Sequence, residues 1–292
     1  MDIHHSRRRF LQKSMAAGLG LSLVGPLSAH AMMKKSKMKL GLVTYQWGKD
    51  WDLPTLIANC EKAGLSGVEL RTQHAHGVET NLTASERADV KKRFADSPVT
   101  CVGYGSNFDY HHVDQAKLKE SIEGTKAYIK LCSDIGATGI KVKPNTLPEE
   151  VSREQTITQI ATSLDEVGRY ASDMGQLIRV EVHGRETQKL PNMKAIFEQV
   201  SEKSVKICWN SNDQDLLAPG LEANFHSVKK WFGDTVHIRE LNVGDYPYQK
   251  LMNLFLEMKY KGWILLEART TPEDRVAAMS EQLEVFHEMI GL

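Results

Sequence analysis

Four polar residues stand at the ends of four apolar stretches in the second half of the chain. They are Glu181 in VEVHG, Asn210 in ICWNSND, His237 in VHIRE and Glu267 in LLEAR. Together these side chains offer three oxygen donors and one imidazole nitrogen. Such a set suits a divalent cation and leaves positions open for substrate oxygens. The two glutamates are also of the type that donates and accepts protons in catalysis.

Other polar residues extend this group toward a substrate. His183 follows Glu181 by two positions and Arg239 follows His237 by two positions. Residues two apart in a strand share a face, so each pair is expected to point inward together. Three further residues are candidates for substrate contact, although a solvated lysine and exposed loop histidines are the alternative for them. These further candidate substrate contacts are Lys143 in IKVKP, His74 in QHAH and His111 in DYHH.

The residues above need a scaffold in which several strand ends meet. Short β-rich stretches recur every thirty to forty residues and are separated by amphipathic helical stretches, which predicts a single (β/α)8 TIM barrel. In this fold the chemistry lies at the carboxyl ends of the strands. The predicted strands are residues 40–45, 67–71, 99–103, 139–142, 177–182, 205–209, 235–239 and 262–267.

Helical patterns fill the gaps between these strands, and glycines such as Gly136 and Gly175 mark helix ends. No linker or low-complexity tract interrupts the alternation, so residues 32–292 are predicted to form one domain. The most regular helical patterns cover residues 53–63, 116–135, 154–174, 193–200, 248–259 and 273–289.

The first residues have the features of an export signal. A basic segment, SRRRFLQK at residues 6–13, precedes an apolar run at residues 15–27 and the small-residue pattern AHA at residues 29–31. This order resembles a twin-arginine signal peptide over residues 1–31, and it implies recognition by the twin-arginine export machinery and a periplasmic or otherwise exported location. A membrane anchor is the alternative, but the apolar run is shorter than the ~20 residues that a span needs.

Charge and cysteine content narrow the class of protein. Residues 1–31 hold four of the 37 basic residues and one of the 37 acidic residues, so the remaining chain has a net charge near −3. A weakly acidic chain without a basic block is a poor partner for nucleic acid. The four cysteines are widely spaced within apolar segments, which favours buried free thiols over a metal or redox motif.

Four short motifs carry a resemblance to a known family. They are GVELR at residues 67–71, EVH at 181–183, HIRE at 237–240 and GWILLE at 262–267. In this order they resemble the xylose isomerase-like superfamily, in its sugar phosphate isomerase/epimerase branch, over residues 38–292. The resemblance implies a divalent metal (Mn, Co, Mg or Zn), with Glu181, His237 and Glu267 as ligands. It also implies that the two glutamates exchange protons with the substrate, while His183 and Arg239 hold its oxygens.

The sixth strand departs from that family pattern. The family has an aspartate at the end of this strand and a histidine three residues later, whereas this chain has Asn210 and Asp213. A neutral amide binds a cation less tightly than a carboxylate does. Either Asn210 is the fourth metal ligand, or Asp213 compensates for it.

The expected function follows from this site. A metal-dependent isomerase or epimerase would remove a proton next to the carbonyl of a keto sugar or its glycoside, through an enediolate. A neutral sugar is expected, because no basic cluster stands at the later strands. A 3-keto-glycoside β-eliminating lyase and a non-catalytic sugar-binding barrel are the alternatives. The resemblance is also compatible with a homo-oligomer, and the charge balance disfavours a DNA endonuclease.

Overall fold

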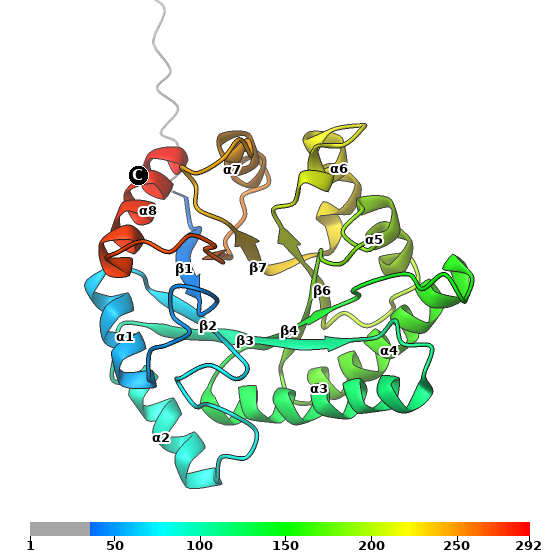
Figure 1. Cartoon of the computed structure of the whole chain (residues 1–292), viewed down its shortest axis with the longest axis horizontal. Helices are drawn as coiled ribbons and strands as arrows, with labels where there is room; N and C mark the ends of the chain where they lie inside the picture. The colour runs from blue at the N-terminus through cyan, green and yellow to red at the C-terminus, as the bar shows by residue number, and fades with distance from the viewer. Residues whose placement is uncertain (1–35) are drawn as a thin grey trace, which may run out of the picture. The chain divides into compact units, whose positions relative to one another are not determined.

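The computed structural model describes residues 36–292, which form a closed barrel of eight parallel strands in chain order. Helices surround the strands on the outside (Figure 1), so the predicted (β/α)8 barrel is confirmed. The strands are β1 (Lys39–Val43), β2 (Gly67–Arg71), β3 (Thr100–Asp109), β4 (Gly139–Lys143), β5 (Leu177–Glu181), β6 (Val205–Asn210), β7 (Phe232–Ile238) and β8 (Trp263–Leu266).

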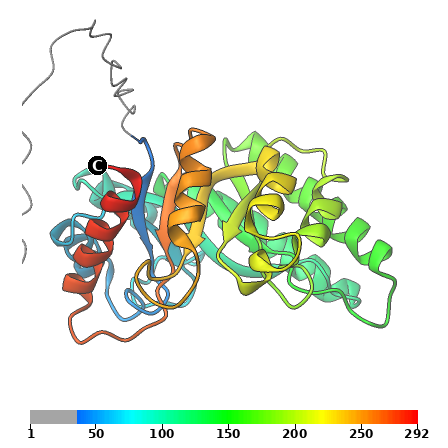
Figure 2. The same ribbon diagram turned by 90° about the horizontal axis from the view of Figure 1, so that it is seen from above.

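Each strand is followed by an α-helix, and two short 3-10 helices accompany the sixth. The first and last strands pair in parallel, and Figure 2 shows α8 beside β1 at this closure. The helices are α1 (Leu53–Lys62), α2 (Ala84–Ala95), α3 (Gln115–Ile135), α4 (Arg153–Asp173), α5 (Leu190–Phe197), η1 (Asp213–Leu216), α6 (Leu221–Val228), η2 (Lys229–Trp231), α7 (Tyr248–Glu257) and α8 (Arg275–Ile290).

Local sequence explains where the helices begin and end. Thr83 caps α2 and Ser152 caps α4, each in a reciprocal capping box with the residue three positions later. Gly136 ends α3 with a left-handed backbone, at φ 82°, which glycine adopts without steric cost. These signals fix the length of each helix and therefore the height at which the next strand enters the barrel.

Three predicted boundaries are wrong in an informative way. Strand β3 continues to Asp109, beyond the predicted end at residue 103, because its last residue still pairs with Lys143 of β4. Strand β7 begins at Phe232, where it pairs with Ile207, three residues before the prediction. Helix α5 covers residues 190–197 instead of 193–200, since a proline stands in its first turn.

Several other expectations concern single features of the chain. All four cysteines are buried free thiols, as predicted. The signal peptide predicted over residues 1–31 lies outside the described residues. In the part of the chain that the structure describes, no helix has the length and apolarity that crossing a membrane requires.

Candidate active site and metal centre

Three of the predicted ligands meet at the carboxyl end of the barrel. Glu181 ends β5, His237 lies on β7 and Glu267 directly follows β8. Each offers a ligand atom, and these atoms all lie within 4.8 Å of one another. All three side chains are buried. The cluster therefore comes from β5, β7 and β8, three of the last four strands of the barrel.

His237 is held in an orientation typical of a metal ligand. Its Nε2 lies 3.1 Å from Oε1 of Glu69, and both side chains are fully buried. Neither ring nitrogen has a hydrogen-bond partner, and Nδ1 lies 3.7 Å from Oε1 of Glu181. Histidines that bind metals commonly turn their second ring nitrogen toward a carboxylate in this way. The ring is thus positioned to present Nδ1 to a cation between it and Glu181.

Glu69 is the residue that supports this orientation, and the sequence alone did not single out its role. It stands on β2 within the GVELR motif, and its carboxylate lies beside Gly105 of β3, the residue paired with Arg71. A Cβ atom at Gly105 would lie only 2.8 Å from Oε1 of Glu69. Glycine at this position therefore leaves the space that the buried carboxylate occupies.

Glu181 has two close partners. Nζ of Lys141 lies 2.8 Å from Oε2 of Glu181, and both side chains are almost completely buried. Nδ2 of Asn210 donates a hydrogen bond of 2.8 Å to Oε1. Burial opposes ionisation of Glu181, but Lys141 and His237 outweigh it and hold the pKa of Glu181 well below its ordinary value. Glu181 is therefore a carboxylate at neutral pH.

The two candidate ligands of the sixth strand lie in different surroundings. Asn210 lies beside the cluster, but in this arrangement it donates to Glu181 instead of offering its oxygen. Asp213 is exposed on η1 and does not take part in the cluster. Asp213 begins η1, directly after β6, and its exposed side chain lies outside the cluster.

The donor set fits a divalent cation. Two carboxylates and one imidazole are suitable ligands, and the buried Nδ1 of His237 has no other partner. Glu181, His237 and Glu267 are the residues that would hold the ion. Lys141 is the unusual neighbour of such a site, because it places a fixed positive charge next to one of the ligands.

Glu267 belongs to a second chain of polar contacts. Arg71, the last residue of β2, donates from Nη1 to Oε1 of Glu267 at 2.9 Å. The same guanidinium donates from Nη2 to Oδ1 of Asn107 at 3.0 Å. Nζ of Lys143 donates to this same oxygen at 3.2 Å. The predicted contact Lys143 thus lies at the edge of the site, and Arg71 links it to Glu267.

His183 is brought to the site as predicted. It is partly buried, and its Nδ1 has no hydrogen-bond partner. Burial lowers the pKa of His183, while Glu181 opposes the shift and Lys143 adds to it. The ring therefore lies within electrostatic range of Glu181 and Lys143, and its lowered pKa keeps it a neutral group that can donate or accept.

Arg239 stands two residues beyond His237 and is partly buried. Its backbone N–H is held by the hydroxyl of Tyr248 at 2.9 Å. Its side-chain Nε has no hydrogen-bond partner. The guanidinium therefore keeps donors available for a bound molecule.

His74 lies at the same end of the barrel but is engaged by the chain. Its Nδ1 is 3.0 Å from the hydroxyl of Thr44, which also accepts a hydrogen bond from the backbone N–H of Arg71. Burial, His76 and Arg71 together lower the pKa of His74 to about 4. His74 is therefore neutral at physiological pH and orders the loop around Arg71.

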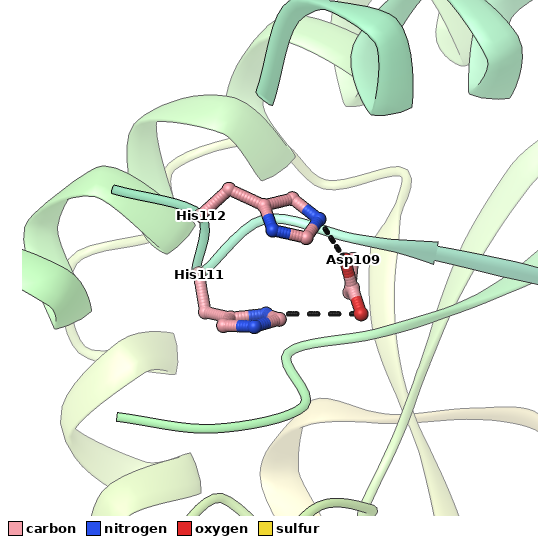
Figure 3. Close-up of side chains that lie close together, drawn as sticks. All are labelled: Asp109, His111 and His112. Carbon is pink, nitrogen blue, oxygen red and sulfur yellow. Dashed lines mark ion pairs between the residues drawn. The ribbon is translucent and has the colours of Figure 1, made fainter. Parts of the chain in front are cut away.

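His111 lies in a different cluster from the one predicted. Figure 3 shows it beside Asp109 and His112, at the end of β3. His111 Nδ1 lies 3.7 Å from Asp109 Oδ2, and His112 Nε2 lies 2.6 Å from Oδ1. Asn145 also donates to Asp109 Oδ2 at 2.7 Å. Asp109 thus joins the loops after β3 and β4, and His111 is not part of the Glu181 cluster.

A family model described as "Xylose isomerase-like TIM barrel" matches residues 57–289, which is most of the chain. The chain belongs to this family. The resemblance carried by the four short motifs is thereby confirmed at the level of the family. No curated protein matches this chain in sequence.

Solved structures share the barrel. The 3-keto-D-glucoside 4-epimerase YcjR from E. coli matches with a TM-score of 0.72 and 15% identity, over 86% of this chain and 99% of that one. An L-ribulose 3-epimerase matches with a TM-score of 0.75 and 15% identity, over 87% and 95%. The IOLI protein, solved with a bound zinc atom, matches with a TM-score of 0.71 and 15% identity, over 87% and 98%. At this identity the likeness shows a common fold.

Proposed function

We propose that this protein is a divalent-metal-dependent sugar isomerase or epimerase that removes a proton next to the carbonyl of a keto sugar or its glycoside. The observation that carries the proposal is the buried cluster of Glu181, His237 and Glu267, whose ligand atoms lie within 4.8 Å of one another. Support also comes from neighbours of the same fold that are sugar epimerases, one of them acting on a 3-keto-glucoside.

A metal ion has a defined place in this proposal. Glu181, His237 and Glu267 would hold it, and Glu69 would keep His237 in the orientation that presents Nδ1. A bound divalent cation would supply electrostatic stabilisation of the negative charge that develops on the substrate oxygens. Mn, Co, Mg and Zn all accept this mixture of oxygen and nitrogen donors.

The two glutamates are the groups that transfer protons. Lys141 and Asn210 hold Glu181 as an oriented carboxylate, the form in which it accepts a proton. Arg71 holds Glu267 from a different strand of the barrel. If one glutamate removes the proton from one face of the substrate and the other returns it from the opposite face, the product is an epimer. Return of the proton to the adjacent carbon gives an isomer.

Three partly buried groups position the substrate in this scheme. His183, Lys143 and Arg239 lie at the ends of β5, β4 and β7, and two of them have a ring or guanidinium nitrogen without a partner. Hydroxyl and carbonyl oxygens of a sugar are suitable acceptors for these donors. Their separate strands hold a sugar from several sides, which fixes the face that is exposed to each glutamate.

The direct test is exchange of the substrate hydrogen with solvent. We expect the metal-loaded protein in deuterated water to introduce deuterium next to the carbonyl of a ketohexose or a 3-keto-glucoside, as NMR would show. Glu181→Gln and Glu267→Gln should lose at least about 1,000-fold in rate, because each removes a proton-transferring group. Glu149→Gln, at a strongly exposed residue, is the control and should retain the parent rate.

Other outcomes of this experiment separate the alternatives. Release of the aglycone from a 3-keto-glycoside would assign the site to a β-eliminating lyase. Sugar binding that survives chelation and gives no exchange would assign it to a non-catalytic binding barrel, and would contradict the proposal.

We also propose that the protein acts in the periplasm after twin-arginine export. The proposal rests on the sequence of residues 6–31. Cell fractionation should find the parent chain in the periplasm, and Arg7→Lys combined with Arg8→Lys should leave it in the cytoplasm. A periplasmic double variant would contradict this route.

A further inference from the structure

Arg71 and Lys143 converge on one neutral atom at the edge of the active site. Nη2 of Arg71 and Nζ of Lys143 donate to Oδ1 of Asn107, at 3.0 and 3.2 Å. Asn107 is exposed, whereas the side chain of Arg71 is only 13% exposed. Two positive groups from β2 and β4 thus lie close together beside Glu267, with an amide oxygen as their shared acceptor.

The other charges of the site are already paired. Lys141 faces Glu181 at 2.8 Å, Arg71 bonds Glu267 at 2.9 Å, and His237 faces Glu69 at 3.1 Å. Lys143 differs from these groups, because within residues 36–292 no carboxylate oxygen lies within 4.0 Å of its Nζ. Every carboxylate of the cluster therefore has a positive or imidazole partner within the protein, and Lys143 is left with an amide oxygen as its partner.

The lack of a carboxylate partner for Lys143 has an energetic cost that a ligand can remove. Burying a charge without a counter-charge is unfavourable, and an amide oxygen does not neutralise it. Burial, Lys141 and Arg71 lower the pKa of Lys143, while Glu181 and Glu267 oppose the shift. A divalent cation at the glutamates would add to the positive charge. A carboxylate is the group that best satisfies an adjacent lysine and arginine, since both donate charge-assisted hydrogen bonds to it.

We propose that Arg71, Lys143 and Asn107 form a subsite for a carboxylate group of the sugar, so that the substrate is a sugar acid. This inference rests on the proposed function and specifies its substrate class. It replaces the expectation of a neutral sugar, which depended on the absence of a basic cluster at the later strands. The basic groups are instead gathered at the second and fourth strands, where residues far apart in sequence meet.

The test compares sugars that differ in one group. D-fructose and D-fructuronate form one pair, and D-glucose and D-glucuronate form a second pair that lacks the ketone. We expect calorimetry on the metal-loaded protein to show that the acid of each pair binds at least about 10-fold more tightly than its neutral partner. Lys143→Met should weaken binding of the acids by about 10- to 100-fold and change binding of the neutral sugars less than about threefold.

Two further variants keep this test informative. Lys143→Arg preserves the charge and should retain the preference for acids. Lys117→Met removes a charge from an exposed position on α3 and should leave binding unchanged. Thermal unfolding of each variant shows whether it is folded.

Two results would overturn the subsite. One is equal binding of acid and neutral sugar in both pairs by the parent protein. The other is an equal loss for both sugars in Lys143→Met, which would assign the lysine to the carbonyl oxygen. Deuterium exchange is measured separately, so carboxylate-dependent binding without exchange would reject the proposed reaction and retain the subsite. Exchange without a preference for the acid would retain the proposed reaction and reject the subsite.

Discussion

Strand β5 carries two inward-facing charged residues, Arg179 and Glu181, whose surroundings are very different. Arg179 is fully buried in the lower barrel and makes four hydrogen bonds, two of them to the carboxylate of Asp234. Glu181, one layer higher, lies among groups whose polar atoms are not all satisfied, including Nδ1 of both His183 and His237. In the lower layer every guanidinium nitrogen of Arg179 is bonded, whereas the upper layer has positions left for a ligand.

The same residue types therefore serve different purposes in the two layers. Around Arg179, even the backbone is adapted to the side chain: a Cβ atom at Gly103 would lie 2.1 Å from its Nη1. A buried charge has a desolvation cost that its partners offset, so removal of a partner is strongly destabilising. A buried polar group without a partner costs stability as it stands, which is typical of functional sites.

Removal of the lower charge should give the largest effect. We expect Arg179→Met to lower the free energy of unfolding by about 3 to 4 kcal/mol, because the buried carbonyl oxygen of Val102 loses its donor and Asp234, whose side chain is 37% exposed, loses its counter-charge. Chemical denaturation measures the loss. Metal binding by the folded fraction should be unchanged. A loss below about 1 kcal/mol would mean that the lower network is not structural.

Replacement of a buried acid near the barrel mouth, Asp215, should change the free energy of unfolding in the opposite direction. Oδ2 of Asp215 accepts hydrogen bonds from the N–H of Asn212 and the hydroxyl of Tyr246, while Oδ1 has no partner. Burial raises the pKa of Asp215 to about 7. Because the folded chain favours the protonated form, its stabilising contribution is complete below about pH 4 and is lost as the pH rises through 7.

Asp215→Asn should therefore stabilise the protein in alkaline solution. We expect the free energy of unfolding of the variant, relative to the parent, to increase between pH 4 and pH 7 by about 2 to 4 kcal/mol and then to remain constant. Denaturation of both proteins across this range is the measurement. A difference that does not change with pH would show that Asp215 is ionised in the folded protein at all these values.

A smaller effect should come from the residue that orients His237. Glu69→Gln keeps the shape of the side chain but removes the charge 3.1 Å from Nε2. Loss of such a partner typically lowers metal affinity by about 10- to 100-fold. Titration of the metal-free protein with zinc would measure it, with the exposed Glu149→Gln as the control. Equal affinity in parent and Glu69→Gln would remove Glu69 from the metal centre.

The sequence allowed the barrel and the principal cluster to be predicted, because both depend on local pattern. Apolar stretches that end in Glu181, His237 and Glu267 are typical of strands whose last residues lie at the mouth of a barrel. The partners of these residues were harder to foresee. Lys141 reaches Glu181 from the neighbouring strand β4, a contact fixed by three-dimensional register.

The surroundings of three other residues could not be predicted from the sequence, for similar reasons. Arg179 has the appearance of an ordinary strand residue until β7 is known to begin at Phe232, which places Asp234 beside it. His111 follows an extension of β3 that no turn signal announces, and the extension carries it to Asp109 and away from the glutamates. Asp213 is exposed because the chain enters η1 directly after β6. Each outcome depends on where a strand ends, to within a few residues.

The most direct measurement of the central claim is the metal content of the purified protein, beside Glu181→Gln and Glu267→Gln prepared identically. The account predicts about one divalent ion per chain in the parent, after reconstitution if the ion is Mg²⁺, and its loss in both variants, since each removes a charged ligand. Glu149→Gln should match the parent. A parent that remains metal-free after reconstitution, or variants that keep the ion, would contradict the metal centre assigned to Glu181, His237 and Glu267.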